Sequence, residues 1–112
     1  MASSADEIKG AFVVTARVEA HPGKADELAQ WFANIKARAD SSEEPGCLQY
    51  NIVRFGDSFA VYEEYTAFEA FTARTTGSPL FREFLKISDT LMKPVVLTYW
   101  SAKSLPAPTV TF

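Results

Sequence analysis

The segment that decides the fold is CLQYNIVRFGDSFAVYEEY, residues 47–65. It contains two runs of β-branched and aromatic residues on either side of Gly56 and Asp57. Such runs are typical of strands, and a glycine next to an aspartate is typical of the tight turn of a hairpin. The segment therefore predicts two antiparallel strands, residues 47–55 and 58–65, that pair with each other.

A strand and a helix are predicted before the hairpin. Residues 11–20 (AFVVTARVEA) are rich in β-branched residues and stop at the turn signal HPGK, residues 21–24, which predicts a first strand. From Ala25 onward, apolar residues recur every three or four positions, as on a helix with one buried face. These apolar residues are Leu28, Trp31, Phe32, Ile35 and Ala39.

A second helix is predicted directly after the hairpin. Thr66 and Glu69 have the spacing of a capping box, in which each side chain bonds a free backbone N–H, so the helix should start near Ala67. Gly77 is expected to end it in the left-handed conformation.

The remaining elements complete a β-α-β-β-α-β order. Ser78 and Pro79 suit the N-cap and first turn of a resumed helix, and residues 94–100 (PVVLTYW) predict a last strand. This order is typical of ferredoxin-like α+β folds. We therefore expect a four-stranded antiparallel sheet with its helices on one face.

The predicted strands alternate poorly between apolar and polar residues, so both faces of the sheet are expected to be covered. Residues 12–18 (FVVTARV) and 95–100 (VVLTYW) place apolar or aromatic groups on both faces. The simplest cover is the same face of a second copy, which predicts a homodimer. The domain should span residues 11–102, between a flexible tail at residues 1–10 and an extension at residues 103–112.

Composition and charge argue against several classes of partner. The 112 residues, 47% of them apolar, suffice for one domain with its own core. Basic and acidic residues, 11 and 14 of them, are interspersed, so no basic stripe is available to bind nucleic acid. No apolar run approaches the roughly 18 residues that span a bilayer, and residues 1–10 lack the apolar stretch of a signal peptide. We therefore expect a cytoplasmic protein that binds neither nucleic acid nor membrane.

Few residues can ligate a metal. The chain has one cysteine, Cys47, and one histidine, His21, too few for the usual zinc, haem-thiolate or iron–sulfur sites. Pro22 and Gly23 follow His21 and indicate an exposed turn, and a catalytic role for this histidine is the alternative. A glycine-rich phosphate or dinucleotide loop is missing from the sequence. We expect neither a metal nor an organic cofactor.

Aromatic residues make up 13% of the chain and suggest where a ligand would bind. Most are expected in the core. Helices and a sheet this rich in rings can also enclose a pocket for a flat hydrophobic molecule. The candidates for its lining, each with a purely structural place in the core as the alternative, are Trp31, Phe71, Phe81 and Phe84.

Three polar residues of the hairpin are candidate site residues. Asn51 lies in the middle of a strand, where asparagine is disfavoured, so it either binds a substrate or bonds a neighbouring loop. Glu63 and Glu64 point to opposite faces of their strand, and at least one of them must point at a covered face. Such a carboxylate is either a base that accepts a substrate proton or half of an ion pair with an arginine.

Arg74 lies four residues after Ala70 and three after Phe71, on the apolar side of a short helix. In one interpretation it complements the helix dipole from the last turn and extends to solvent. In the other, its guanidinium faces the pocket and holds an anion such as a carboxylate, an enolate, a phenolate or reduced oxygen.

Four segments of the chain resemble, in order, the motifs of the antibiotic biosynthesis monooxygenase family. They are VVTARVEAHPGKADELAQWF (13–32), EEPGCLQYNIVR (43–54), FAVYEEYTAFEAFTA (59–73) and SPLFREFL (78–85). The resemblance covers nearly the whole domain. It implies a dimeric α+β barrel, and an enzyme of secondary metabolism that oxidises a phenol, quinol or anthrone with O2 and without a metal or flavin.

The resemblance also implies site residues. Tyr65 matches a pocket position where many members of the family have tryptophan, and Arg74 matches one where many have histidine. A base or ligand role of that histidine does not carry over to arginine, which argues against haem degradation. Arginine can still stabilise an anion, and the proton-accepting role passes to Glu63 or Glu64. The expected partners are a small aromatic substrate, O2 and a second copy of the chain, and the alternative is a non-catalytic dimer that only binds a hydrophobe.

Overall fold

The computed structural model describes residues 7–103, in which helices and strands follow the predicted order. Their bounds are β1 (Phe12–Glu19), α1 (Ala25–Ala39), β2 (Cys47–Phe55), β3 (Ser58–Tyr65), α2 (Phe68–Gly77), α3 (Pro79–Leu91) and β4 (Thr98–Ser101). The predicted extension beyond Lys103 and most of the predicted tail at residues 1–10 lie outside the described part of the chain.

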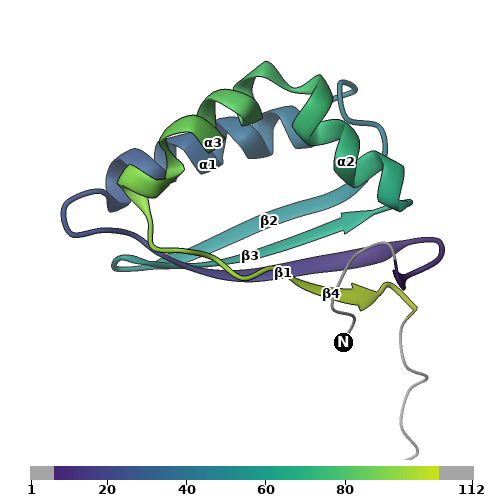
Figure 1. Cartoon of the computed structure of the whole chain (residues 1–112), viewed down its shortest axis with the longest axis horizontal. Coiled ribbons are helices and arrows are strands. Elements are labelled where there is room, and N and C mark those ends of the chain that lie inside the picture. Colours follow the sequence, from purple (N-terminus) through teal and green to yellow (C-terminus); the bar gives the residue numbers. More distant parts are fainter. Residues whose placement is uncertain (1–6, 104–112) are drawn as a thin grey trace, which may run out of the picture.

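The strands form one antiparallel sheet in the order β2-β3-β1-β4, and α1, α2 and α3 lie over one face of it (Figure 1). This arrangement confirms the predicted ferredoxin-like α+β fold. Within the predicted hairpin, Phe55 pairs with Ser58 and Gly56 turns the chain with a φ of 61°, a value that glycine adopts at little steric cost. The turn fixes the register from Phe55 back to Gln49 and places Tyr50 opposite Glu63, whereas the register shifts between Gln49 and Cys47.

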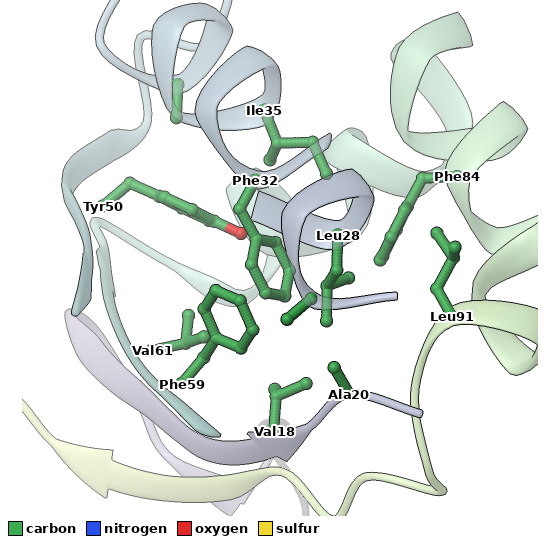
Figure 2. Close-up of a cluster of buried hydrophobic side chains, with 12 residues drawn as sticks. Val18, Ala20, Leu28, Phe32, Ile35, Tyr50, Phe59, Val61, Phe84 and Leu91 are labelled. Atoms are coloured by element: carbon green, nitrogen blue, oxygen red, sulfur yellow. The ribbon is translucent and has the colours of Figure 1, made fainter. Parts of the chain in front are cut away.

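The core fills the space between the sheet and the helices, and Figure 2 shows its larger part. Phe32 of α1 lies near the middle, with the ring of Phe59 at 5.3 Å and that of Phe84 at 5.8 Å. A smaller cluster lies next to α2 and consists of Phe12, Val14 and Tyr65. The apolar positions predicted for the first helix are buried or half-buried: Leu28, Trp31, Phe32, Ile35 and Ala39.

The start and end of α2 differ from the prediction. Ala67 is the N-cap in an extended conformation, and no side chain caps the helix. The helix therefore begins one residue later than the Thr66–Glu69 pattern requires, and the predicted capping box is wrong. The predicted left-handed Gly77 is also wrong, because only Gly10, Gly23 and Gly56 have positive φ in the described part.

The junction between α2 and α3 lies at Ser78. Ser78 has an extended backbone with φ −111° and ψ 106°, so the chain turns there without a left-handed residue. Its hydroxyl oxygen accepts a hydrogen bond from the backbone N–H of Phe81 at 3.1 Å, as an N-cap does. The predicted restart of the helix at Ser78 and Pro79 is confirmed.

β4 is shorter than the predicted strand at residues 94–100. Thr98 pairs with Thr15, and the next bridge towards the start of the segment joins Met92 to Ala20. Between these two pairs, residues 93–97 lie opposite residues 16–19, so the later segment has one residue in excess. The excess residue prevents a regular ladder, and Pro94 has no N–H to donate. The segment instead forms part of the cavity wall described below.

The face of the sheet away from the helices carries apolar side chains. Val53 of β2 is 67% exposed and Phe55 at the hairpin tip is 91% exposed. Tyr62 and Trp100 are also exposed on this face. We use the name open face for it below. In the described residues, none of the helices has the length and apolar character needed to cross a bilayer.

Candidate active site

A cavity of about 610 Å³ lies between the sheet and α3. Its walls come from β1, β2, β3, α1, the end of α2, α3 and the segment before β4. Most of them are apolar, whereas Glu63 and Arg74 bring opposite charges to one part of the wall. The residues that line the cavity are Ala16, Val18, His21, Phe32, Tyr50, Val61, Glu63, Arg74, Phe81, Phe84, Leu85, Ser88, Asp89, Met92, Lys93, Pro94, Val95 and Leu97.

Glu63 reaches the cavity because of its place in β3. Successive side chains of a strand point to opposite faces, and Glu63 alternates with Val61 and Tyr65 on the face below the helices. Its exposed fraction is 4%. A carboxylate buried this deeply needs a partner.

Arg74 of α2 is that partner, and it is itself only 6% exposed. Its Nη1 donates to Oε1 of Glu63, forming an ion pair, and to the hydroxyl oxygen of Tyr65 at 2.8 Å. The Tyr65 hydroxyl in turn donates to the same Oε1 at 2.6 Å. Arg74 therefore points inward, and the interpretation in which it extends to solvent is wrong.

Aromatic rings surround the guanidinium of Arg74. Its Cζ lies 4.2 Å from the ring centroid of Phe81 and 5.4 Å from that of Phe71. The rings of Tyr50 and Tyr65 are each 5.8 Å away. Cation–π attraction is strongest where water is excluded, so these rings help to hold the charge in an otherwise apolar place.

The pKa values of the cluster follow from its burial and its charges. Burial first, and then the charge of Glu63, raise the pKa of the Tyr65 hydroxyl far above its usual range. Burial would lower the pKa of Arg74, but the neighbouring acidic groups, Glu63 first, outweigh it and raise the pKa. Tyr65 is thus a neutral donor and Arg74 a permanent cation near pH 7.

Two atoms of the cluster accept or donate no hydrogen bond in the described part of the chain. Arg74 Nε is buried and has no hydrogen-bond partner among the described residues. Oε2 of Glu63 accepts no hydrogen bond within residues 7–103, since Arg74 and Tyr65 both use Oε1. A buried donor without a partner is costly, and Arg74 Nε is also sealed from solvent. Arg74 as a residue still lines the cavity, so its positive charge acts on a ligand there.

Only some of the predicted aromatic candidates line the cavity. Phe81 and Phe84 line it. Tyr65 and Phe71 lie behind the charged pair, with their rings 5.3 Å apart. Trp31 packs against Phe84 at 5.8 Å but is not part of the lining.

Two predicted polar residues lie on the open face instead. The Asn51 side chain donates to Oε1 of Gln49 at 3.3 Å, and Glu64 accepts a hydrogen bond from the Tyr62 hydroxyl at 3.4 Å. Neither lines the cavity. Only Glu63 of the two neighbouring carboxylates therefore meets Arg74.

Tyr50 also lines the cavity, although the sequence pattern did not single it out. The signal was present in the hairpin, because the turn at Gly56 places Tyr50 directly opposite Glu63. The segment at residues 92–95 gave no comparable signal. Its position depends on the excess residue opposite β1, which is a property of the assembled sheet.

His21 lines the cavity as well, close to Asp89. Its Nε2 lies 3.0 Å from the Asp89 backbone oxygen, to which it donates, so the ring ties the turn before α1 to the end of α3. Across residues 7–103, no three histidine, cysteine, aspartate or glutamate side chains gather as a metal site would require.

Gly46 holds α2 close to the sheet and thereby positions Arg74. A Cβ added at Gly46 would overlap Ala70 of α2 and lie 3.3 Å from the Thr66 hydroxyl. Gly46→Ala should therefore push α2 outward and lower the free energy of unfolding by about 1–3 kcal/mol, measured by urea denaturation. Gly77→Ala is the matched control, because a Cβ there meets nothing within 4 Å. An equal loss in both variants would contradict this account.

Comparison with known proteins agrees with the fold described above. No curated protein sequence is significantly similar to the chain. Solved structures that are similar include three bacterial proteins. A candidate antibiotic biosynthesis monooxygenase from Caulobacter crescentus CB15 is 26% identical, with a TM-score of 0.74 over 86% of this chain and 92% of that one. PA3566 from Pseudomonas aeruginosa is 20% identical, with a TM-score of 0.75 over 93% and 100%.

The third similar structure is that of a mutant form of SnoaB from Streptomyces nogalater, a cofactor-independent oxygenase. It is 20% identical, with a TM-score of 0.68 over 88% of this chain and 99% of that one. Residues 11–87, well over half of the chain, match the family model described as antibiotic biosynthesis monooxygenase. The chain therefore belongs to the antibiotic biosynthesis monooxygenase family.

Proposed function

We propose that this chain is a cofactor-independent monooxygenase that oxidises a small, flat, hydroxylated or enolisable hydrophobe with O2. The proposed substrate classes are quinols and anthrones. The observation that carries the proposal is the Glu63–Arg74 pair, which brings a buried carboxylate and a guanidinium to the wall of a cavity lined mostly by apolar side chains. Membership of the family and the likeness to SnoaB support it.

In the proposed reaction, Glu63 accepts the acidic proton of the substrate. Its Oε2 is the acceptor, since Oε1 already accepts hydrogen bonds from Arg74 and Tyr65. Removing the proton leaves a phenolate or enolate, which is electron-rich enough to reduce O2. A carboxylate within hydrogen-bond reach of a reacting group is a common general base.

Arg74 stabilises the anion that results. Its fixed positive charge at the cavity wall favours an oxygen that becomes negative during the reaction. The anion passes an electron to O2, and the two radicals combine to a peroxide at the oxidised carbon. Glu63 returns its proton to the peroxide, and the O–O bond then breaks together with the remaining C–H bond of the same carbon. One oxygen atom stays in the product as a carbonyl, and the other leaves as water with these two protons. The apolar walls keep water from the radicals.

Oxygen consumption tests the proposal. The protein is mixed with hydroquinones or anthrone in an oxygen electrode, and uptake should exceed that of the protein-free control. With labelled O2, one labelled atom should enter each product molecule. Uptake no faster than the control across the panel would refute the oxygenase proposal.

A second function, binding of a hydrophobe without chemistry, is favoured by one observation. Glu63 has a permanent partner in Arg74 and a second donor in Tyr65, which is what a purely structural ion pair requires. A protein of this kind would bind the same compounds under argon and in air, and would release them unchanged.

The open face supports a homodimer in which two sheets pack against each other. Exposed apolar side chains that gather on one face commonly mark interfaces, and Val53 lies on the open face at 67% exposure. Two chains of 12.4 kDa each should therefore elute as one particle of twice that mass in size-exclusion chromatography with light scattering.

Val53→Asp is expected to shift this dimer to a monomer, because it places a charge in a desolvated contact. The control is Ala33→Asp, on the exposed side of α1, which should leave the mass unchanged. A monomeric wild-type protein, or a dimer that Val53→Asp does not weaken, would refute this interface.

A further inference from the structure

The Tyr50 hydroxyl lacks a hydrogen-bond partner within residues 7–103, although Tyr50 is only 3% exposed. The side chain extends from β2 into the core towards Phe32 (Figure 2). The backbone oxygen of the same residue is occupied, since it accepts a hydrogen bond from Lys36 Nζ at 2.7 Å. The strand is thus held to α1, whereas the hydroxyl at the end of the ring has no assigned role.

Tyr50 lines the cavity, and its hydroxyl oxygen is not sealed from solvent. In the described part of the chain, Arg38 Nε and Arg74 Nε are the polar side-chain atoms that are sealed from solvent and make no hydrogen bond, although Arg38 Nε forms an ion pair with Glu44 at 3.0 Å. The Tyr50 oxygen has no partner either but is not among these sealed atoms. Because the residue lines the cavity, the oxygen is reachable from there.

Tyr50 also lies next to the charged pair. It is the cross-strand neighbour of Glu63, and its ring centroid is 5.8 Å from Arg74 Cζ. Burial first, and then the charge of Glu63, raise the pKa of Tyr50, so the hydroxyl keeps its proton. Buried hydroxyl groups in proteins nearly always have a hydrogen-bond partner, and a ligand in the cavity can supply it.

We infer that Tyr50 is a specificity-determining residue whose hydroxyl donates a hydrogen bond to a second oxygen of the substrate. The inference rests on the proposed function, in which Arg74 holds the first oxygen. The proximity of Tyr50 to Arg74 requires the two oxygens to lie on one ring or on adjacent fused rings. The site therefore selects dioxygenated aromatic compounds over those with a single hydroxyl.

Binding under argon tests this inference separately from oxygen chemistry. The probes are 1-naphthol, with one oxygen, and its 1,3-, 1,5- and 1,8-dihydroxy analogues, titrated calorimetrically. At least one diol should bind the wild-type protein about three- to tenfold more tightly than 1-naphthol, the effect of one neutral hydrogen bond. In Tyr50→Phe this preference should disappear, while the affinity for 1-naphthol changes less than about twofold.

Tyr62→Phe is the matched control, because it removes a tyrosine hydroxyl on the open face and should change neither affinity. Tyr50→Phe removes an atom without a protein partner, so its thermal midpoint should match that of the wild type. The inference is overturned if no diol is preferred, if no probe binds, or if Tyr50→Phe weakens 1-naphthol and the diols equally. Normal diol preference without oxygen uptake would instead refute only the proposed oxygenase activity.

Discussion

Arg74→Ala is expected to lower the free energy of unfolding by about 3–5 kcal/mol, the range for a buried ion pair that loses one partner. The physical reason is that Glu63, 4% exposed, would keep a charge among apolar residues without a counter-ion. For a domain of this size such a loss corresponds to a drop of more than about 10 °C in the thermal midpoint. Circular dichroism during heating measures it directly.

A double variant separates the charge effect from the loss of packing. In Glu63→Gln with Arg74→Met, neither charge remains and the methionine refills much of the space between the rings. Replacement of a whole buried pair by uncharged groups is often nearly neutral, so this protein should be clearly more stable than Arg74→Ala. If both variants are equally unstable, the pair does not act as described.

Glu63→Gln is expected to lower kcat about 10²- to 10⁴-fold, the usual contribution of a general base. Glutamine has nearly the same shape but cannot accept the substrate proton. The measurement is the rate of oxygen uptake with a saturating quinol or anthrone, well below the thermal midpoint of the variant. The unpaired Arg74 also destabilises this variant, and circular dichroism must first show that it is folded at the assay temperature.

Glu64→Gln is the matched control for this experiment. Glu64 is the next residue of β3, but it lies on the open face beside Tyr62 and does not line the cavity. Its substitution should change kcat less than about twofold. Full activity of Glu63→Gln, or an equal loss of activity in both variants, would show that Glu63 is not the general base.

Much of the fold was predictable because it depends on local patterns. The turn at Gly56 and Asp57 set the register of most of the hairpin, the spacing of apolar residues located α1, and Ser78 with Pro79 located the start of α3. Where the prediction was wrong, a local pattern competed with packing. The Thr66–Glu69 pattern is present in the sequence, but the chain leaves β3 in an extended conformation through Ala67 and starts the helix one residue later.

The candidate site was predictable only in part. Alternation along β3 showed that Glu63 and Glu64 face opposite ways, and the spacing in α2 put Arg74 on the apolar side. The placement of Asn51 on the open face could not be read from the pattern, because its strand carries apolar residues on both faces. Tyr50 was missed because the pattern treats a tyrosine in a strand as ordinary core.

The sequence by itself determined the order of the elements, the hairpin register and the two faces of each strand, since these follow from periodicity and turn chemistry within short segments. Tertiary structure alone decided that Arg74 turns inward to Glu63. It also decided that residues 93–97 leave the regular ladder and form part of the cavity wall. Both depend on segments distant in sequence. An arginine turns inward only where another element supplies a buried carboxylate, and an excess residue shows only when two strands are paired.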